Sequence, residues 1–262
     1  MPKYVFCDID YTLIDDEMNI TDNNYKAIKR FESAGNRFIL CSGRVPFALD
    51  KYRIALDAKD IVCANGAFVI SDNKIIKEYY LSKNILEVIA SYVIKNNIYA
   101  RFFSSDYLYI VNIPKNFSFT FLYKQHDVID NDMLKKIIQT KKIIKVVFAS
   151  DNPDVLKKAK EDINNLGLNL EIELSSPVFL EINGKDQNKG NGVLDYCKFN
   201  NINIKDTVSI GDNENDLSML KITGFSACPS NGIEVVKQNV DYICKNDNNN
   251  SAVAEVLEKI EY

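Results

Sequence analysis

Histidine is nearly absent from this sequence: among 262 residues there is one, His126. A zinc site built on histidines, or a Ser-His-Asp triad, therefore has little to draw on. The residues around His126, from 124 to 132, are mostly polar, which predicts an exposed loop. Glycine and proline are not in excess, with 10 and 6 residues, so the composition is that of a globular protein.

Long apolar runs are also missing. No stretch approaches the roughly 20 apolar residues that cross a bilayer, and Asp8 and Asp10 interrupt the early apolar run, so no signal peptide is predicted. The formal net charge of −4 gives no electrostatic reason to expect nucleic acid or an acidic membrane as partner. We expect a cytoplasmic protein with no nucleic-acid or membrane partner.

The six cysteines lack the C-x-x-C spacing of thiolate metal sites. Cys7, Cys41 and Cys63 lie inside apolar, strand-like runs, where a free cysteine behaves as a small hydrophobe. Disulfides are not expected in a reducing compartment. We therefore predict that the cysteines serve packing.

The two terminal parts of the chain alternate between strand and helix patterns, and 262 residues allow one large domain or two smaller ones. Strands are predicted over residues 4–7, 37–41, 60–64, 206–210, around 225 and over 242–244. Helices are predicted over residues 23–34, 46–56, 189–200, 233–238 and 252–260, and a further helix is predicted to end at residue 220. Such alternation predicts an α/β fold with a Rossmann-like parallel sheet. The asparagine-rich run 246–250 is predicted as a loop.

The middle of the chain has a different character. Helices are predicted over residues 81–96, 132–140 and 153–166, and strands over 143–149 and 168–182, after an aromatic, strand-like region at 99–123 that includes Phe117, Phe119 and Phe121. Without polar residues at each strand end, this pattern is typical of an α+β unit. We predict an inserted α+β domain at residues 80–184, within a core domain formed by residues 1–79 and 185–262.

Two aspartates, Asp8 and Asp10, follow the first predicted strand. An unpaired buried charge is costly, so such a pair must face solvent, bind a cation or take part in chemistry. Aspartate also favours an ordinary strand-to-loop turn. From this stretch alone the two interpretations carry equal weight.

Polar clusters follow four of the predicted core strands. They are Asp8, Asp10 and Thr12; Ser42, Gly43 and Arg44; Asn65 and Gly66; and Gly211, Asp212, Asn215 and Asp216. In an open parallel sheet, ligands bind at the carboxyl ends of the strands. Each cluster alone could be a solvated turn or a helix cap. Their recurrence at every strand end predicts a shared site, which Lys189 joins from a helix start.

The residue types in these clusters suit phosphoryl transfer. Asp8, Asp10 and Asp212 can hold Mg²⁺ with carboxylate oxygens, while Ser42 and Lys189 supply a hydroxyl and a cation for phosphate oxygens. An aspartate can also act as nucleophile through an acyl phosphate. The sequence has no G-x-x-x-x-G-K-[ST] motif, which disfavours a P-loop NTPase.

The order of these motifs resembles that of a known family. D-I-D-Y-T-L, C-S-G-R, Lys189-Gly190 and G-D-N-E-N-D are similar to the four motifs of the haloacid dehalogenase-like (HAD) hydrolases. The N-G-A at Asn65 and the position of the insertion resemble the Cof-like phosphatases of subfamily IIB. The resemblance covers nearly the whole chain and implies an α/β core with a mobile cap that reads the leaving group.

The resemblance implies a role for each matching residue. Asp8 is the expected nucleophile and Mg²⁺ ligand, Asp10 the general acid and base and, through its backbone carbonyl, a further metal ligand, and Asp212 the last protein ligand. The residues expected to bind phosphate are Ser42, Lys189, Thr12 and Gly43. Those expected to bind substrate are Arg44, Asn65 and Asn215, and Asp216 is expected to hold waters around the metal. Lys189 is also expected to restrain Asp8 against the neighbouring carboxylates.

Two positions depart from the family pattern. Tyr11 stands where these phosphatases usually have glycine, so the first loop carries a bulky side chain. The segment before Lys189 is unusually polar and offers Lys185 as a competitor for the cationic role. We prefer Lys189, because Gly190 and a helical pattern follow it directly.

We therefore predict a phosphoric monoester hydrolase that uses Mg²⁺ and an aspartyl-phosphate to hydrolyse a small phosphorylated metabolite. A sugar phosphate is the first expectation and a phosphorylated cofactor such as pyridoxal phosphate the second. Two alternatives stay open: a phosphomutase of related architecture and a non-catalytic phosphate-binding protein. The sequence does not determine the oligomeric state.

Overall fold

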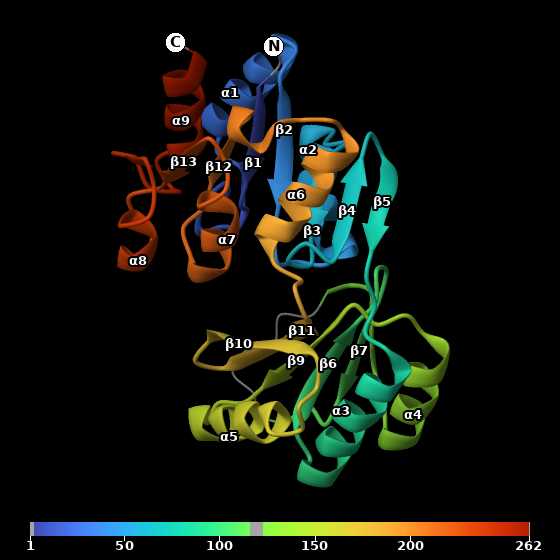
Figure 1. Ribbon diagram of the computed structural model, residues 1–262. Coiled ribbons are helices and arrows are strands. Elements are labelled where there is room, and N and C mark those ends of the chain that lie inside the picture. The colour runs from blue at the N-terminus through green and yellow to red at the C-terminus, as the bar shows by residue number, and fades with distance from the viewer. Residues whose placement is uncertain (1–2, 116–122, 262) are drawn as a thin grey trace. The chain divides into compact units, whose positions relative to one another are not determined.

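The structure is a computed structural model that describes residues 3–115 and 123–261. It contains two compact units (Figure 1). Unit 1 comprises Met1–Arg44, Leu49–Glu78 and Asn188–Tyr262, and unit 2 comprises Val45–Ala48 and Tyr79–Gln187. Among the described residues, no helix is both long enough and apolar enough to span a membrane.

Unit 1 is built on an eight-stranded sheet with the order β14-β13-β12-β1-β2-β3-β4-β5. The strands are β1 (Tyr4–Cys7), β2 (Arg37–Cys41), β3 (Ile61–Cys63), β4 (Phe68–Ser71), β5 (Lys74–Glu78), β12 (Thr207–Ile210), β13 (Phe225–Cys228) and β14 (Tyr242–Ile243). The strands from β14 to β3 pair in parallel, while β4 and β5 are antiparallel. The predicted α/β class with a parallel-sheet core is confirmed.

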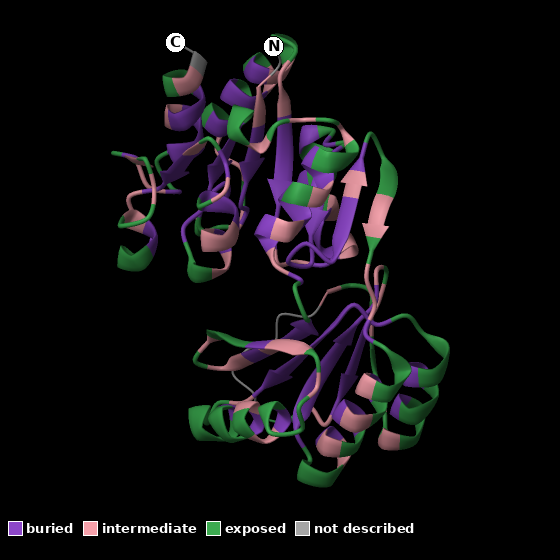
Figure 2. Ribbon diagram, in the orientation of Figure 1, coloured by how far each residue is buried: buried purple, intermediate pink, exposed green. Residues whose placement is uncertain are grey.

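Helices cover both faces of this sheet. The helices of unit 1 are α1 (Asp22–Ser33), α2 (Asp50–Leu56), α6 (Lys189–Phe199), α7 (Leu217–Leu220), α8 (Glu234–Lys237) and α9 (Ala252–Glu261). Because side chains alternate along a strand, Phe6 and Ile39 pack with Val193 of α6 and Met219 of α7, and their neighbours turn to the face where α1 packs with α9. The central strands are therefore buried on both faces (Figure 2).

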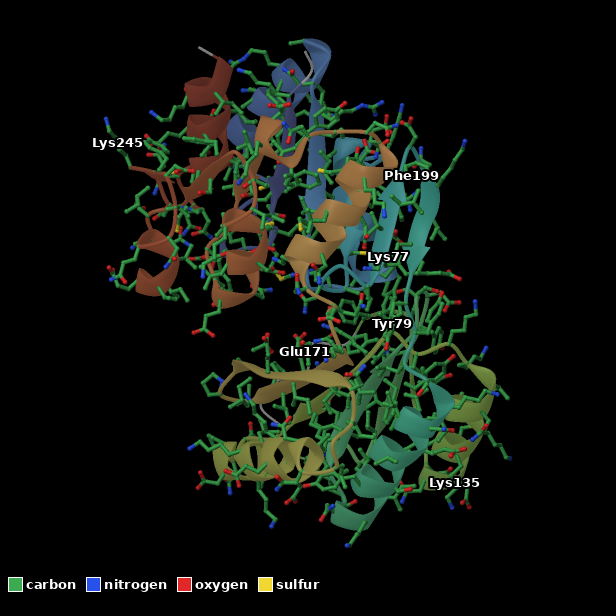
Figure 3. All side chains as sticks on the ribbon, viewed as in Figure 1. Lys77, Tyr79, Lys135, Glu171, Phe199 and Lys245 are labelled. Atoms are coloured by element: carbon green, nitrogen blue, oxygen red, sulfur yellow. The ribbon has the colours of Figure 1, made fainter. Side chains whose placement is uncertain are left out.

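The hairpin β4–β5 was not predicted. Its two-residue turn is Asp72-Asn73, and both residues have positive φ, 47° and 61°. Aspartate and asparagine tolerate this conformation, so they serve a tight hairpin without the glycine that usually marks one. The Lys77 ammonium on β5 lies 2.7 Å from the Asp195 carboxylate of α6, which ties the hairpin to the helix layer. Figure 3 labels Lys77 on this strand.

The order of the strands places a switch point beside β1. From β1 the chain moves through β2 and β3 to one side, whereas β12, β13 and β14 lie in sequence on the other side. Crossovers that diverge in this way leave a crevice at the carboxyl ends of the two central strands, which is where open α/β sheets bind ligands. β1 and β12 deliver Asp8 and Asp212 to this place.

Unit 2 is a six-stranded sheet with the order β10-β11-β9-β6-β7-β8, covered by helices on one face (Figure 1). Its strands are β6 (Tyr99–Phe103), β7 (Leu108–Val111), β8 (His126–Val128), β9 (Lys145–Ala149), β10 (Leu170–Ser176) and β11 (Phe179–Gly184), and its helices α3 (Lys83–Asn96), α4 (Asn131–Thr140) and α5 (Pro153–Asn164). Only the pair β7–β8 is parallel among these strands of the described chain. The α+β character expected of this segment is present.

His126 and the aromatic region at 99–123 both belong to unit 2. His126 was expected in an exposed loop, but it begins β8 and is half-buried, because β7 needs a partner for its outer edge. The aromatic region predicted over 99–123 contains β6 and β7, whereas Phe117, Phe119 and Phe121 lie outside the described residues.

All six cysteines are buried and carry free thiols. Cys7, Cys41 and Cys63 lie in β1, β2 and β3, as predicted. Burial raises the pKa of Cys228 and of Cys244 to about 12, so these thiols stay protonated near neutral pH. Protonated, buried thiols are poor nucleophiles and pack as small apolar groups.

Glu255 of α9 holds the segment that follows β14. Its carboxylate accepts hydrogen bonds from Tyr242 Oη at 2.6 Å and from the backbone N–H groups of Lys245 and Asn246, both at 2.9 Å. Partial burial raises the pKa of this carboxyl, but the three hydrogen bonds outweigh it and lower the pKa below the ordinary value.

We expect Glu255→Gln to lower the free energy of unfolding at pH 7 by about 1 kcal/mol, because hydrogen bonds to the charged carboxylate weaken and solvent screens part of their value. The folded-state pKa is depressed, so this contribution is present above the unfolded-state pKa of about 4.3 and is lost as pH falls through the folded-state value. Urea titrations of both proteins at pH 7 and pH 3.5 measure it. A difference that stays constant over this range would contradict the assignment.

Candidate active site

Asp8 follows β1 directly and is buried, with 5% of its surface exposed. Its backbone N–H donates to the carbonyl of Ile210, the last residue of β12, at 2.9 Å. The strand pairing therefore fixes the Asp8 backbone at the switch point. Burial, and after it the Asp216 carboxylate, raises the pKa of Asp8 well above its ordinary value.

Lys189 is the first residue of α6 and is fully buried. Its Nζ lies 2.5 Å from Asp8 Oδ1 and 2.5 Å from Asp216 Oδ1. Burial lowers the pKa of Lys189, but Asp216 and Asp8 outweigh it and raise the pKa above the ordinary value, so the ammonium stays charged. Lys185, the competing lysine, is exposed.

Asp216 organises the loop that follows β12. Its Oδ1 accepts from Lys189, and its Oδ2 accepts the backbone N–H groups of Asp212 at 3.0 Å and Asn213 at 3.1 Å. Asp216 was expected to hold waters around a metal. In the structure both of its oxygens accept hydrogen bonds from the protein, and a Cβ at Gly211 would lie 2.5 Å from Asp216 Cγ, so only glycine fits there.

Thr12 and Asp212 face each other across the two central loops. Thr12 Oγ1 donates to Asp212 Oδ1 at 2.7 Å, and both residues are buried. Thr12 was expected to contact phosphate; in the structure its hydroxyl orients the Asp212 carboxylate. Burial, followed by the Asp216 carboxylate, raises the pKa of Asp212 to about 6.

Asp8, Asp212 and Asp216 form a buried group whose ligand oxygens lie within 4.8 Å of one another. With the three carboxylates ionised and Lys189 as their counter-charge, the group carries a net charge of −2. Burial, and after it the Asp216 charge, raises the pKa of both Asp8 and Asp212, and a bound cation would favour their ionised forms. An oxygen-rich, anionic donor set of this kind fits a hard divalent cation.

The Asp10 carboxylate does not join this group. It forms a two-pronged ion pair with Arg44, in which Arg44 Nε lies 2.8 Å from Asp10 Oδ2 and Nη2 contacts Oδ1. Two parallel charge-assisted hydrogen bonds fix both the position and the plane of a carboxylate. The Arg44 guanidinium also lies over the Tyr52 ring, 5.5 Å from its centroid. Arg44, expected to bind substrate, thus orients Asp10.

The loops after β2 and β3 meet beside these groups. Ser42 is buried, and its Oγ accepts the backbone N–H of Arg44 at 3.1 Å. The Asn65 N–H donates to the Ser42 carbonyl at 3.2 Å, and a Cβ on Gly43 would lie 3.0 Å from Asn65 Oδ1. Asn215 is half-buried in the 3-10 turn that also carries Asp216.

Three asparagines near Asp10 were missed by the sequence analysis. Asn24, Asn231 and Asn248 each donate a side-chain N–H to a backbone carbonyl of the loop 11–14. Two of them lie more than 200 positions from this loop in the sequence. No local pattern signals the contacts of Asn231 and Asn248, because they depend on how the segments after β13 and β14 fold back onto the loop after β1.

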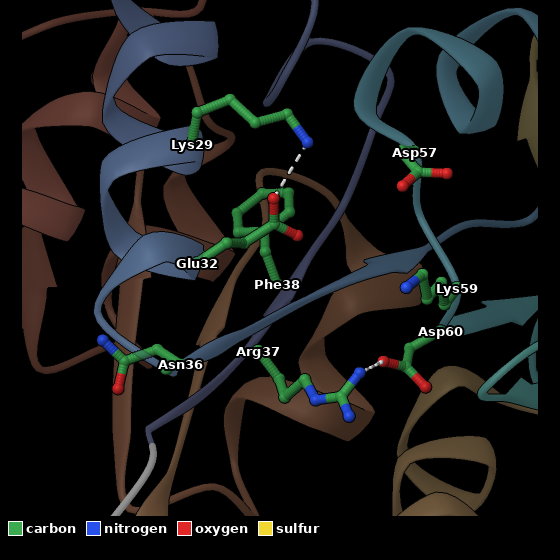
Figure 4. Close-up of a pocket in the computed structure, with 9 residues that line it drawn as sticks. Lys29, Glu32, Asn36, Arg37, Phe38, Asp57, Lys59 and Asp60 are labelled. Carbon is green, nitrogen blue, oxygen red and sulfur yellow. Dashed lines mark hydrogen bonds and ion pairs between the residues drawn. The ribbon is translucent and has the colours of Figure 1, made fainter.

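A separate pocket opens at the opposite ends of β2 and β3 (Figure 4). Four of its charged groups form two pairs, Lys29 with Glu32 at 3.0 Å and Arg37 with Asp60 at 3.3 Å, and Asp57 and Lys59 contribute one further charge of each sign. Because these side chains neutralise each other and lie at the amino ends of the strands, the pocket does not share the chemistry of the candidate site.

Comparisons with known proteins identify the family. The family model for haloacid dehalogenase-like hydrolases matches residues 5–257. A Buchnera aphidicola protein from the Schizaphis graminum host, named provisionally as a phosphatase, is 29% identical over 99% of this chain and 96% of its own. The Bacillus subtilis 5-amino-6-(5-phospho-D-ribitylamino)uracil phosphatase YwtE is 24% identical over 95% of this chain and 94% of its own.

A solved structure supports the fold. That of the HAD subclass IIB sugar phosphatase BT4131 has a TM-score of 0.82 and 19% identity, and the match covers 99% of both chains. At this identity it is evidence for the fold alone. The family resemblance drawn from the motifs and the prediction of a hydrolytic enzyme are both confirmed by the family model. The chain belongs to the haloacid dehalogenase-like hydrolases, and the curated relatives described above carry phosphatase names.

Proposed function

We propose that this enzyme hydrolyses a small phosphorylated metabolite with Mg²⁺ as cofactor, Asp8 as nucleophile and Asp10 as proton carrier. One observation supports the proposal above the others. A fully buried lysine, Lys189, lies between the Asp8 and Asp216 carboxylates, and the Asp212 carboxylate belongs to the same cluster. An arrangement this costly to bury is typical of a catalytic site.

Asp8 and Asp212 would hold the metal through side-chain oxygens, with Asp10 adding its backbone carbonyl. When bound, Mg²⁺ supplies positive charge against the phosphoryl oxygens and the reacting carboxylate. Asp216 would act indirectly, because its oxygens accept the hydrogen bonds that orient Lys189 and the Asp212 loop. Lys189 and the Ser42 hydroxyl would bind the remaining phosphoryl oxygens, helped by the backbone N–H of Gly43.

The reaction would proceed in two displacements. An Asp8 carboxylate oxygen attacks phosphorus in line with the leaving oxygen, the ester P–O bond breaks, and Asp10 protonates the departing alkoxide. Asp10 then takes a proton from water, whose oxygen attacks the aspartyl-phosphate and releases inorganic phosphate with Asp8 restored. The ion pair with Arg44 would hold the Asp10 carboxylate in position for both proton transfers.

We also propose that unit 2 is the cap that selects the substrate. The sheet face of unit 2 opposite its helices carries Arg101 and Lys145 beside aromatic rings. The Arg101 guanidinium lies 5.1 Å from the centroids of the Tyr99 and Phe179 rings. Both cations are buried, and Lys145 pairs with Glu181 at 2.9 Å, so this face combines paired charges with aromatic rings, which suits a leaving group with hydroxyl substituents. A sugar or polyol phosphate is the first candidate, in line with the names of YwtE and BT4131.

The direct test is phosphate release from p-nitrophenyl phosphate and from a panel of sugar, polyol and cofactor phosphates. We expect turnover with Mg²⁺, and a loss of at least about a hundredfold with excess EDTA that added Mg²⁺ restores, because the carboxylate cluster then lacks its counter-charge. Turnover that is equal in EDTA would contradict metal dependence. Conversion of a sugar phosphate to its isomer, stimulated by the bisphosphate, would favour the phosphomutase, and inactivity across the panel the non-catalytic alternative.

A further inference from the structure

Three asparagine side chains hold the loop that follows Asp10. Asn231 Nδ2 donates to the Tyr11 carbonyl at 2.8 Å, Asn24 Nδ2 to the Leu13 carbonyl at 3.0 Å, and Asn248 Nδ2 to the Ile14 carbonyl at 3.0 Å. We call these three residues, Asn24, Asn231 and Asn248, the asparagine clamp. An asparagine amide can be fixed through its oxygen while its nitrogen donates, so it is suited to this task.

The clamp is itself anchored. Asn231 Oδ1 accepts the backbone N–H of Asn248 at 3.0 Å, and Asn24 Oδ1 accepts the backbone N–H of Ala254 at 2.9 Å. The loop that carries Asn231 also contacts the other half of the site, because the Ile233 N–H donates to the Asp212 carbonyl at 3.0 Å. One short loop therefore joins the segment after β1 to the segment after β12.

The backbone of Tyr11 has an unfavourable conformation that the clamp can stabilise. Tyr11 has φ of 58°, in the left-handed region that bulky residues avoid, and 63% of its surface is exposed. So exposed a side chain gains little packing to offset the backbone strain. The backbone N–H groups of Leu13 and Ile14 donate to the Ile9 carbonyl and close the turn around Tyr11, and the Asn231 side chain adds a hydrogen bond to the Tyr11 carbonyl itself.

We propose that Asn231 is a positioning residue for catalysis: it holds Tyr11 in the left-handed conformation and thereby keeps the carbonyl and carboxylate of Asp10 in place. Asn24 and Asn248 support it by fixing the next carbonyls of the same loop. The inference rests on the proposed roles of Asp8 and Asp10. Its consequence is that a glycine at position 11, which adopts positive φ without strain, needs the clamp less.

The test compares Asn231→Ala with the matched control Asn239→Ala. Asn239 is also exposed and donates Nδ2 to a backbone carbonyl, that of Val235, at the same 2.8 Å, but away from the site. We expect Asn231→Ala to lower kcat about five- to tenfold, the value of one hydrogen bond, with KM within about twofold. Asn239→Ala leaves both constants unchanged. Tyr11→Gly in the Asn231→Ala background restores kcat to within about twofold of the parent Tyr11→Gly variant.

A second measurement separates positioning from simple loosening of the fold. Amide hydrogen exchange is expected to quicken at residues 12–16 in Asn231→Ala and to stay unchanged elsewhere and in Asn239→Ala. Faster exchange with unchanged kcat would overturn the positioning role, and unchanged exchange would overturn the clamp. Failure of the proposed function has a different signature: active Asp8→Asn, or inactive wild type, with the exchange result still decisive for the clamp.

Discussion

Replacing Asp8 by asparagine is expected to lower kcat by at least about a thousandfold on any phosphate that the enzyme hydrolyses. The amide cannot attack phosphorus, and loss of a covalent nucleophile removes the whole two-step route. Phosphate release under saturating Mg²⁺ measures the effect. Incubation of the wild type with substrate and acid quench, followed by peptide mass spectrometry, is expected to show phosphate on the peptide that contains Asp8 and none in the variant.

The same substitution is expected to leave the fold intact. Burial and the Asp216 carboxylate disfavour the ionised form of Asp8, so a neutral amide removes charge repulsion while Lys189 keeps its contact with Asp216. We expect the Tm of Asp8→Asn to equal or exceed that of the wild type in EDTA. Asp195→Asn, which alters a carboxylate that pairs with Lys77 of β5, is the matched control for activity. Retention of more than a tenth of wild-type turnover by Asp8→Asn would refute the nucleophile assignment.

Lys189→Met is expected to have the largest effect on stability. The substitution leaves Asp8 and Asp216 buried without the cation that contacts both at 2.5 Å. Breaking a buried ion pair by removing one partner costs about 3–5 kcal/mol. Urea titration at pH 7 in EDTA measures the loss, and turnover is expected to disappear with it.

Lys77→Met provides the matched control, because Lys77 Nζ contacts the Asp195 carboxylate at a similar 2.7 Å but at the surface. We expect a loss of about 1 kcal/mol or less, since exposed ion pairs gain little. Equal losses for the two variants would show that burial does not set the value of the Lys189 contacts. In an Asp8→Asn background, Lys189→Met should cost less, because one of the two carboxylates is already neutral.

The fold class follows from local patterns. Apolar runs alternating with helical spacing predict the parallel strands from β1 to β3 and from β12 to β14, because strands buried on both faces are continuously apolar. The hairpin β4–β5 was not predicted from the sequence, because its turn uses Asp72 and Asn73 in place of glycine. β8 was not predicted either, because it begins with the polar residue His126 and forms a strand only through its pairing with β7 at the edge of the sheet.

The membership of the candidate site was also readable from the sequence. Asp8, Ser42 and Asp212 directly follow apolar strands, and Lys189 opens a helix, so a parallel sheet brings them to one edge. The contact of Lys189 with Asp8 was expected, but other contacts within the site were not predicted from the sequence. Thr12 orients Asp212 and Arg44 orients Asp10, in addition to the phosphate contact predicted for Thr12 and the substrate contact predicted for Arg44.

The sequence by itself determined which residue types stand at the strand ends, and therefore the family. The tertiary structure alone decided which donor serves most of the acceptors. Thr12 meets Asp212 and Asn231 meets Tyr11, in each case across about 200 to 220 positions of the chain. Hydrogen bonds weaken when the distance between donor and acceptor changes by a few tenths of an ångström, and these distances arise only when the crossovers have placed β12 beside β1 and β13 next to β12.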